Sequence, residues 1–346
     1  MVDAPPPPLR LDLDAGALAQ NWRTLDRMSG QAAAGAAVKA DAYGIGIDRV
    51  VPVLAKAGAR EFFVAHWCEA PALLRHVPAE QVSALHGPLT DADCAFARAT
   101  GVRPVLNSVA QVARWRATGS GPCHLMVDTG INRLGLPLSA LGDPVLDGLE
   151  IDILMSHLAA ADEDSERNSA QLARFSQACA AIPARRHSLA NSAGIALGSR
   201  YAFDLTRPGL ALYGGVPRAE FAAAIRPVVT PRAAILQVRE IAAGDGVGYN
   251  AAFVAAESMR IGVVSLGYAD GFLRSRGPGQ SLRSGGANLR LLGKVSMDMV
   301  AVDLAPVPAL REGDWLEVPF DLPTVSASSG LSQYELLTTL GARFQR

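Results

Sequence analysis

Residues 82–127 read VSALHGPLTDADCAFARATGVRPVLNSVAQVARWRATGSGPCHLMV, and this stretch decides the predicted fold. Short apolar runs alternate in it with segments whose apolar residues recur at helical spacing. The apolar runs are Val82–Leu85, Pro104–Leu106 and His124–Val127, and the helical segments are Asp91–Ala99 and Ser108–Ala117. Strands that alternate with helices in this way indicate βαβ units and a parallel sheet. The stretch therefore predicts an α/β fold.

The same alternation extends outward in both directions, from Leu9 to about Pro217. The further strands expected are Ala36–Val38, Phe62–Ala65, Ile151–Met155, His187–Ala190 and Leu210–Tyr213, and the further helices include Asp48–Ala57, Ser165–Ala181 and one that begins near Asp14. Eight strands that alternate with helices predict a (β/α)8 barrel of the TIM type, which we assign to residues 9–222. A doubly wound open sheet is the alternative, and the first strand is not followed by the GxGxxG motif that would favour it.

Beyond about Ile225 the pattern changes to runs typical of strands. These runs are Ala233–Ile241, Met259–Ser265, Leu289–Asp303 and Trp315–Val318, with a hairpin turn expected at Gly285-Gly286 and a closing helix at Ser332–Leu340. Residues 223–346 are therefore expected to form a second, mainly β domain. The proline run Pro5–Pro8 predicts a flexible tail over residues 1–8.

Composition narrows the possible functions. Hydrophobic residues make up 49% of the chain, but no run of about 18 apolar residues predicts a membrane span. The net charge of -1 does not suggest a nucleic-acid surface. The four cysteines form no CxxC pair, and the N-terminus does not look like a signal peptide. We therefore expect a cytoplasmic protein that acts on a small molecule and binds no metal.

Lysine is scarce in this chain. Of 32 basic residues only Lys39, Lys56 and Lys294 are lysines. Lys39 ends the first predicted strand, among small residues and just before Gly44 and Gly46. A lysine at a strand end is ordinarily a solvated surface cation. Here its rarity and its small neighbours favour a chemical role, since arginine cannot supply a neutral amine.

Other polar residues follow the expected strands of the barrel. They lie in Val127–Gly135, in Ser156-His157, in Asn191–Gly194 and in Arg207–Gly209. Catalytic groups of such barrels lie at the C-terminal ends of the strands, so these residues are expected to share one face. Ser192 and the N–H groups around it are suited to binding a phosphate.

These motifs resemble the alanine racemase family, the fold-type III pyridoxal-phosphate (PLP) enzymes. The resemblance runs from Asn21 to Arg346 and rests on AVKADAYG, VDTGINRLG, MSHLAAADE, ANSAG, RPGLALYG, GVGYNAAF, LGYADGF, GKVSMDMVAVD and QYELLTTLGARFQR. It implies a homodimer with shared active sites. It also implies interconversion of L-alanine and D-alanine, either to supply D-alanine for peptidoglycan or to catabolise it.

The resemblance also implies a role for each matching residue. Lys39 forms the Schiff base with PLP and is one acid–base group, and Tyr249 from the partner subunit is the other. Arg207 faces the pyridine nitrogen, and His157 lies near the ring and helps to position Arg207. The residues implied at the phosphate are Tyr43, Ser192, Gly209, Leu210 and Tyr334, with Asn191 close by. Those implied at the substrate are Arg133 and Met297, with Tyr268 at the entrance and Asp298 beside Met297.

Physical chemistry agrees with these roles. Racemisation removes a proton from one face of Cα and returns it on the other, which two acid–base groups on opposite faces can do. Arg207 stays protonated, so it can only donate to the pyridine nitrogen and leaves that nitrogen without a proton. We expect this to weaken the electron sink and to limit side reactions.

Two positions depart from the family pattern. Many members carry a carbamylated lysine where this chain has Met126, so Arg133 must be oriented in another way. Our hypothesis is that an anion such as chloride, or another side chain, replaces the carbamate. Ile45 stands where a histidine is more usual, and it is expected to alter loop packing.

Three alternatives remain open from the sequence. A PLP carrier would not need the second domain with Tyr249, Met297 and Tyr334. A decarboxylase of the same architecture would pair the pyridine nitrogen with a carboxylate, which Arg207 disfavours. A racemase of serine or of broad specificity is the third, and the bulk of Tyr249 and Tyr268 favours a methyl-sized side chain.

Overall fold

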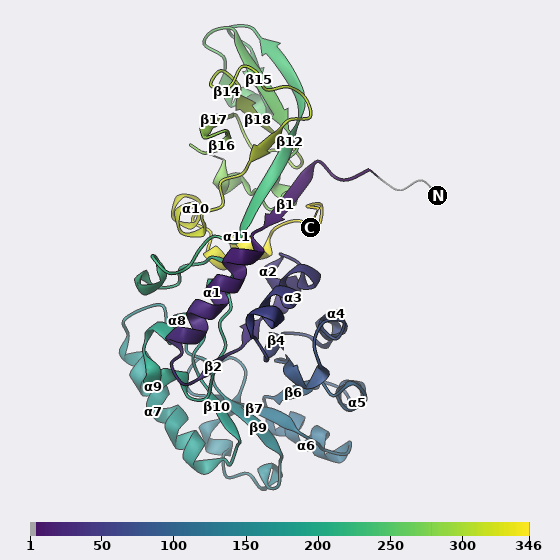
Figure 1. Cartoon of the computed structure of the whole chain (residues 1–346), viewed down its shortest axis with the longest axis vertical. Helices are drawn as coiled ribbons and strands as arrows, with labels where there is room; N and C mark the ends of the chain where they lie inside the picture. The colour runs from purple at the N-terminus through teal and green to yellow at the C-terminus, as the bar shows by residue number, and fades with distance from the viewer. Residues whose placement is uncertain (1–4, 278, 346) are drawn as a thin grey trace. The chain divides into compact units, whose positions relative to one another are not determined.

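The computed structural model describes residues 5–277 and 279–345, which divide into two compact units (Figure 1). One consists of residues 15–226 and is called the barrel unit here. The other joins residues 227–346 to the N-terminal segment that ends at Asp14, and it is called the β unit. Over the part of the chain described, every helix is too short or too polar to cross a membrane.

The barrel unit is built on a parallel sheet with the strand order β10-β9-β7-β6-β5-β4-β3. Its strands are β3 (Ala36–Ala37), β4 (Phe62–Val64), β5 (Val82–Ala84), β6 (Arg103–Leu106), β7 (Cys123–Asp128), β9 (Ile151–Met155) and β10 (Arg186–Ser188), with β8 (Leu136–Pro137) beside β7. Seven predicted strands are therefore confirmed in place and order.

The eighth predicted strand is wrong in position. Leu210–Tyr213 forms a buried 3-10 helix, η5, that ends at Gly214 with φ 91°. The eighth strand is instead β11 (Leu205–Thr206), which pairs in parallel with β2 (Ala33–Ala34). A short apolar run cannot be assigned to a strand or to a buried helical turn from periodicity alone, which explains the error.

Backbone hydrogen bonds around β11 bring the two edges of the sheet together. The Gly35 nitrogen donates to the Thr206 oxygen (2.9 Å), and the Ala37 nitrogen donates to the Pro208 oxygen (2.8 Å). On the other side of β11, the Arg207 nitrogen donates to the Ala190 oxygen just beyond β10 (2.8 Å). These bonds close the sheet into the predicted TIM-type barrel.

The long helices of the barrel unit begin close to where the sequence predicted. They are α1 (Ala15–Met28), α3 (Ile47–Ala57), α5 (Asp91–Thr100), α6 (Val109–Ala117) and α7 (Glu166–Ala181). The unit also has the short helices α2 (Lys39–Tyr43), α4 (Ala70–Leu73), α8 (Ser192–Ala196) and α9 (Ser199–Ala202), with 3-10 turns η1 (Trp67–Glu69), η2 (Ala79–Gln81), η3 (Leu138–Ala140), η4 (Pro144–Leu146) and η6 (Ala219–Phe221). Ser108 and Ser165 cap α6 and α7 with their side chains, which stops both helices from extending further toward their N-termini.

Side chains of the barrel strands alternate between two apolar layers. Leu125 and Val127 of β7 pack outward against residues such as Trp115 and Phe175 of the surrounding helices. Met126 packs on the opposite side of β7, in a cluster with Phe63, Val105, Ile153, Met155 and Leu205. The alternation follows from the two-residue period of a strand. The barrel interior is therefore filled by side chains.

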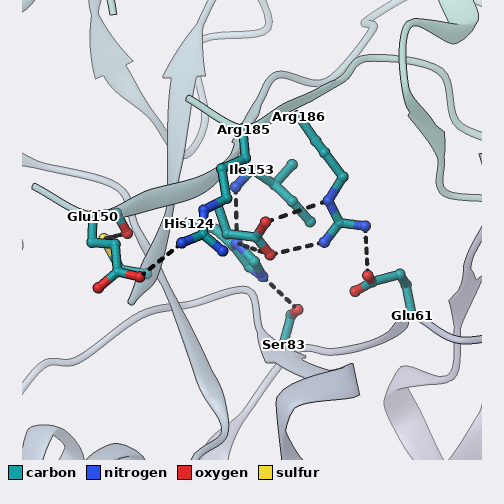
Figure 2. A network of polar contacts seen from close by, with 9 residues as sticks. Glu61, Ser83, His124, Glu150, Ile153, Arg185 and Arg186 are labelled. Atoms are coloured by element: carbon teal, nitrogen blue, oxygen red, sulfur yellow. Dashed lines mark hydrogen bonds and ion pairs between the residues drawn. The ribbon is translucent and has the colours of Figure 1, made fainter. Parts of the chain in front are cut away.

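A polar network lies near the N-terminal ends of the barrel strands (Figure 2). The Nδ1 of buried His124 accepts the N–H of Ile153 (3.2 Å), so the ring proton is on Nε2, which donates to Ser83 Oγ (3.1 Å). Arg186 joins Glu61 (2.6 Å) to Asp152 (2.8 Å) beside this ring. Such ends of barrel strands serve stability, while the opposite face carries chemistry.

The β unit is an antiparallel sheet with the order β1-β12-β15-β18-β17-β16-β19, closed by a further β12–β19 pairing. Its strands are β1 (Leu9–Leu13), β12 (Val229–Ile241), β13 (Gly246–Val247), β14 (Phe253–Val254), β15 (Met259–Val264), β16 (Ser281–Ser284), β17 (Ala287–Leu292), β18 (Val300–Asp303) and β19 (Trp315–Glu317). Its helices are α10 (Leu322–Ser329) and α11 (Gln333–Thr338), with 3-10 turns η7 (Tyr249–Ala251), η8 (Tyr268–Asp270) and η9 (Arg274–Arg276). The mainly β prediction is confirmed.

Two features of this unit differ from the prediction. The segment Leu9–Leu13, which was grouped with the barrel, pairs with β12 in antiparallel register. The single predicted run Leu289–Asp303 contains parts of two strands, β17 and β18. Gly293, with a φ of 72°, directly follows β17 and ends that strand.

Candidate active site

The C-terminal ends of the barrel strands bring the predicted polar residues to one face. Lys39 follows β3, Arg133 lies in the loop after β7, His157 follows β9, Asn191 and Ser192 follow β10, and Arg207 follows β11. Because all these strands are parallel, the residues at their C-terminal ends surround one end of the barrel. The structure therefore assembles them as expected.

Lys39 is partly buried and has an altered acidity. Burial lowers the pKa of its amine, and the positive charge of Arg133 lowers it further. The carboxylate of Glu69 acts in the opposite direction. Since burial disfavours the charged ammonium, the neutral amine of Lys39 forms at a lower pH than in an ordinary lysine. A neutral amine is the form that can attack a carbonyl or accept a proton.

A left-handed turn follows Lys39. The four residues Ala40–Tyr43 have φ values between 53° and 57°, and none of them is glycine. This conformation costs roughly 1–2 kcal/mol per residue. Asp41 stabilises the exit of the turn, because its Oδ1 accepts the Ile47 N–H (2.8 Å) and its backbone oxygen accepts the Gly46 N–H (2.9 Å). Lys39 stands at the start of this turn and Tyr43 at its end.

Tyr43 and Gly209 lie against one another. A Cβ on Gly209 would stand 2.3 Å from the Tyr43 hydroxyl oxygen, so any larger residue there would displace Tyr43. The Tyr43 ring also packs on Tyr213, with ring centroids 4.7 Å apart. Tyr213 in turn donates to the Ala37 oxygen (2.9 Å) beside Lys39. The position of the Tyr43 hydroxyl is thus set from two sides.

Ser192 organises the backbone beyond Gly209. Its Oγ accepts the N–H groups of Gly209 (2.9 Å) and Ala211 (3.2 Å), which flank the buried Leu210. The side chain of Asn191 accepts the Gly194 N–H (2.9 Å). A serine that accepts two amides still has its own hydrogen to donate. With the Tyr43 hydroxyl it can donate to phosphate oxygens, so these residues fit the phosphate of PLP.

Arg207 is a buried cation, with 6% of its surface exposed. Its Nη2 donates to the Ser156 oxygen (2.5 Å), and its Nη1 donates to Ser188 Oγ. Over residues 5–277 and 279–345, no carboxylate forms an ion pair with it. Burial lowers the pKa of Arg207 to about 10, so it stays protonated at neutral pH. Such a donor without an acid partner fits a neutral acceptor such as a pyridine nitrogen.

His157 is held neutral at this face. Burial, and then the charge of Arg207, lower its pKa to about 3. Gln171 fixes the backbone from His157 to Ala159, since its Nε2 donates to the His157 oxygen (3.0 Å) and its Oε1 accepts the Ala159 N–H (2.8 Å). The direct bonds that position Arg207 come from Ser156 and Ser188, and the charge of Arg207 in turn helps to keep His157 neutral.

The loop that carries Arg133 is organised by Asp128. The Asp128 carboxylate accepts the N–H groups of Gly130 (2.7 Å), Ile131 (3.0 Å) and Arg133 (3.1 Å). Met126, two residues earlier, is only 7% exposed and belongs to the apolar barrel interior. The position that would carry a carbamate is therefore occupied by an apolar side chain.

The other predicted residues belong to the β unit. Tyr249, Met297 and Tyr334 are exposed there, at 62%, 53% and 46%. Tyr268 lies beside the Met297 segment, because its N–H donates to the Ser296 oxygen (3.1 Å). A Cβ at the preceding residue, Gly267, would stand 2.1 Å from the Met297 oxygen. The structure thus joins Tyr268 to Met297.

Asp298 is held by an arginine that the sequence did not single out. Arg343 donates to Asp298 Oδ1 (2.7 Å) and to the buried Asp270 Oδ1 (2.7 Å). Asp270 Oδ2 accepts the Gly267 N–H (2.9 Å). The sequence prediction also missed Ser188, which contacts Arg207, and Glu69, which contacts the residue after Lys39. Ser188 is the last residue of β10, so a search of every strand end for polar residues would have found it, whereas Glu69 lies in the 3-10 turn η1, five residues beyond β4.

The chain matches the models of two protein families over nearly its whole length. Residues 13–217 match the family described as "Alanine racemase, N-terminal domain", and residues 228–346 match "Alanine racemase, C-terminal domain".

Relatives and solved structures agree with this match. The chain is 42% identical to "Alanine racemase, biosynthetic" of Agrobacterium fabrum, with 98% of this chain and 93% of that protein covered. It is 39% identical to "Alanine racemase, catabolic" of the same organism, with 97% and 91% covered. Its structure is similar to that of alanine racemase from Bartonella henselae with covalently bound pyridoxal phosphate, at a TM-score of 0.89, 34% identity and 99% coverage of both chains.

Proposed function

The chain belongs to the alanine racemase family and interconverts L-alanine and D-alanine with pyridoxal 5′-phosphate, and from this premise we propose which residues carry the reaction. The two acid–base groups are Lys39 and Tyr249. The observation that supports Lys39 most directly is its position at a strand end, with a pKa lowered by burial and by Arg133.

The residues that hold the cofactor come mainly from the barrel face. Lys39 binds it covalently through its amine. The phosphate is bound by Tyr43, Ser192, Gly209, Leu210 and Tyr334, with Asn191 shaping the backbone beside them. When bound, PLP supplies the electron sink that makes the substrate Cα–H acidic. Arg207 would donate a hydrogen bond to the ring nitrogen, and because its pKa of about 10 keeps the proton on the guanidinium, it would transfer no proton to that nitrogen.

The two acid–base groups work on opposite faces of the substrate Cα. Lys39 Nζ would remove or return the proton on one face, and Tyr249 Oη would do so on the other. His157 stays neutral and contributes no charge to compete with Arg207. Arg133 and Met297 bind the substrate carboxylate region, and Tyr268 narrows the entrance.

We also propose that Tyr249 acts in the active site of a partner subunit, so that the enzyme is a homodimer. Its ring is 62% exposed, and the next two residues are held at φ 61° and 47°. Exposed aromatic rings on strained backbone are typical of binding surfaces. A cytoplasmic location accords with the four free cysteines, since thiols persist in reducing compartments.

The test is complementation between two inactive variants, followed by circular dichroism of an L-alanine solution. Lys39→Ala and Tyr249→Phe should each abolish decay of the signal. When the two are unfolded together and refolded as a mixture, half of the dimers carry one intact site, so about a quarter of wild-type activity should return. Activity that stays at zero in the mixture would contradict the shared site. Activity retained in Tyr249→Phe alone would contradict the role of Tyr249.

A further inference from the structure

Glu69 connects the segment after strand β4 to the segment that follows Lys39. It ends the 3-10 turn η1 (Trp67–Glu69), which follows β4. Its Oε2 accepts the N–H groups of Ala65 (2.8 Å) and His66 (2.9 Å). Its Oε1 accepts the N–H of Ala40, the residue that directly follows Lys39. One carboxylate thus ties the end of strand β4 to the start of the left-handed turn.

The turn needs such anchors because its backbone is unfavourable. Asp41 holds the exit of the turn through the Ile47 N–H (2.8 Å), while Glu69 holds the entrance through Ala40. Non-glycine residues persist in the left-handed region only where their surroundings over-determine the conformation. If the bond from Ala40 to Glu69 were lost, the backbone at the start of the turn could rotate. The Lys39 side chain would then point in a different direction.

We propose that Glu69 is a positioning residue of the racemase: it fixes the left-handed turn and thereby aims the Lys39 amine. This inference rests on the proposed role of Lys39. A helix cap alone would explain the bond from His66, which is the N-cap residue of the 3-10 turn that Glu69 ends. It would not explain the bond to Ala40, which is 29 residues away in the sequence.

Glu69 also affects the protonation of Lys39. The test must separate this electrostatic effect from the effect of Glu69 on the position of the Lys39 amine. The Glu69 carboxylate raises the pKa of the Lys39 amine, against the effects of burial and Arg133. Replacing it by a neutral residue should therefore yield more neutral amine at a given pH, which speeds attack. Misplacement of the Lys39 amine should slow attack at every pH. The electrostatic effect therefore raises the rate of attack, whereas the positional effect lowers it.

The experiment compares Glu69→Gln with the control Asp93→Asn. Asp93 likewise accepts two backbone N–H groups, from Leu89 (2.8 Å) and Thr90 (2.8 Å), at the start of α5. The readout is the rate at which pyridoxal phosphate attaches to the apo-protein, followed by absorbance at the high-pH plateau. Borohydride reduction and peptide mass analysis then identify the lysine.

In Glu69→Gln, an NH2 group replaces one of the two carboxylate oxygens. Since both oxygens accept backbone N–H groups, this NH2 group faces another donor and one of the bonds is lost. We expect the plateau rate and kcat to fall about 10- to 100-fold, since a displacement of about 1 Å can cost that much. KM for alanine should stay within about threefold, because Glu69 binds no substrate. Asp93→Asn should leave all three within about twofold of wild type.

A rescue variant keeps the test decisive. Glycine adopts the left-handed region at no steric cost, so Ala40→Gly in the Glu69→Gln background should restore much of the lost rate. A Glu69→Gln plateau rate and kcat equal to those of Asp93→Asn would overturn the inference, as would no restoration by Ala40→Gly. Attachment of the cofactor to another lysine in the wild type would instead contradict the proposed role of Lys39.

Discussion

The hydroxyl of Tyr43 occupies the space where a side chain on Gly209 would begin, since a Cβ there would stand 2.3 Å from that oxygen. Gly209→Ala should therefore displace Tyr43 and weaken pyridoxal phosphate binding about 10-fold, the loss of roughly one good hydrogen bond. Fluorescence titration of the apo-protein measures this. Gly142→Ala is the control, because its Cβ would meet nothing within 4 Å. Equal affinity in the two variants would contradict a role for Tyr43 at the cofactor.

Ser188 carries a second prediction through Arg207. Its hydroxyl accepts from Arg207 Nη1 and donates to the buried Leu205 oxygen (2.5 Å). Ser188→Ala leaves both groups unsatisfied, so the free energy of unfolding should fall by about 1–3 kcal/mol and kcat should fall as well. Urea unfolding and the absorbance band of the bound cofactor report the two effects. Ser176→Ala removes only an exposed helix hydroxyl, which bonds Leu172, and should change neither.

Most of the barrel could be predicted because its strands are buried and short and its helices have clear caps. Ser108 and Ser165 are polar residues just before apolar spacing begins, and each caps the helix predicted from it. β1 could not be placed, because its partner β12 lies more than 200 residues away and nothing local specifies that pairing. Leu210–Tyr213 misled the prediction because buried turns and buried strands share one composition.

The site was predictable where a residue type has few other uses and unpredictable where it depends on geometry. Lys39 stands at a strand end in a chain with only three lysines, so its position carried information. Arg207 has no such rarity and was identified through the motif RPGLALYG. The left-handed backbone after Lys39 has no local signal, because Ala40 and Ala42 ordinarily favour right-handed helix. The contacts of Ser188 with Arg207 and of Glu69 with Ala40 arise only once the strands are adjacent.

The acidity of Lys39 yields a third prediction. Burial and the charge of Arg133 lower its pKa, so the rate of cofactor attachment should reach its plateau at a lower pH than for an ordinary lysine. Arg133→Gln removes one of these causes, and the pH profile of attachment should therefore move to higher pH. Arg116→Gln, which breaks bonds to Val145 and Asp147 on the surface, should leave the profile in place. An unmoved profile in Arg133→Gln would contradict the electrostatic coupling.

The buried ring of His124 determines the fourth prediction, which concerns stability in acid (Figure 2). Burial lowers the pKa of folded His124 to about 3, while an unfolded histidine titrates near 6.5. Between these values the unfolded state binds more protons, so the free energy of unfolding decreases as the pH falls from about 6.5 toward 3. For this one residue the loss between pH 7 and pH 5 is about 2 kcal/mol.

His124→Gln removes the titrating ring but can keep its two hydrogen bonds. The side-chain amide can donate to Ser83 and accept from Ile153, as the ring does. Urea unfolding at pH 7 and pH 5 should show about 2 kcal/mol less loss in this variant than in the wild type. Ser83→Ala separates titration from bonding: it should lower stability by a similar amount at both pH values, because the buried ring remains. If His124→Gln and the wild type lost the same stability between pH 7 and pH 5, another titrating group would carry the acid sensitivity.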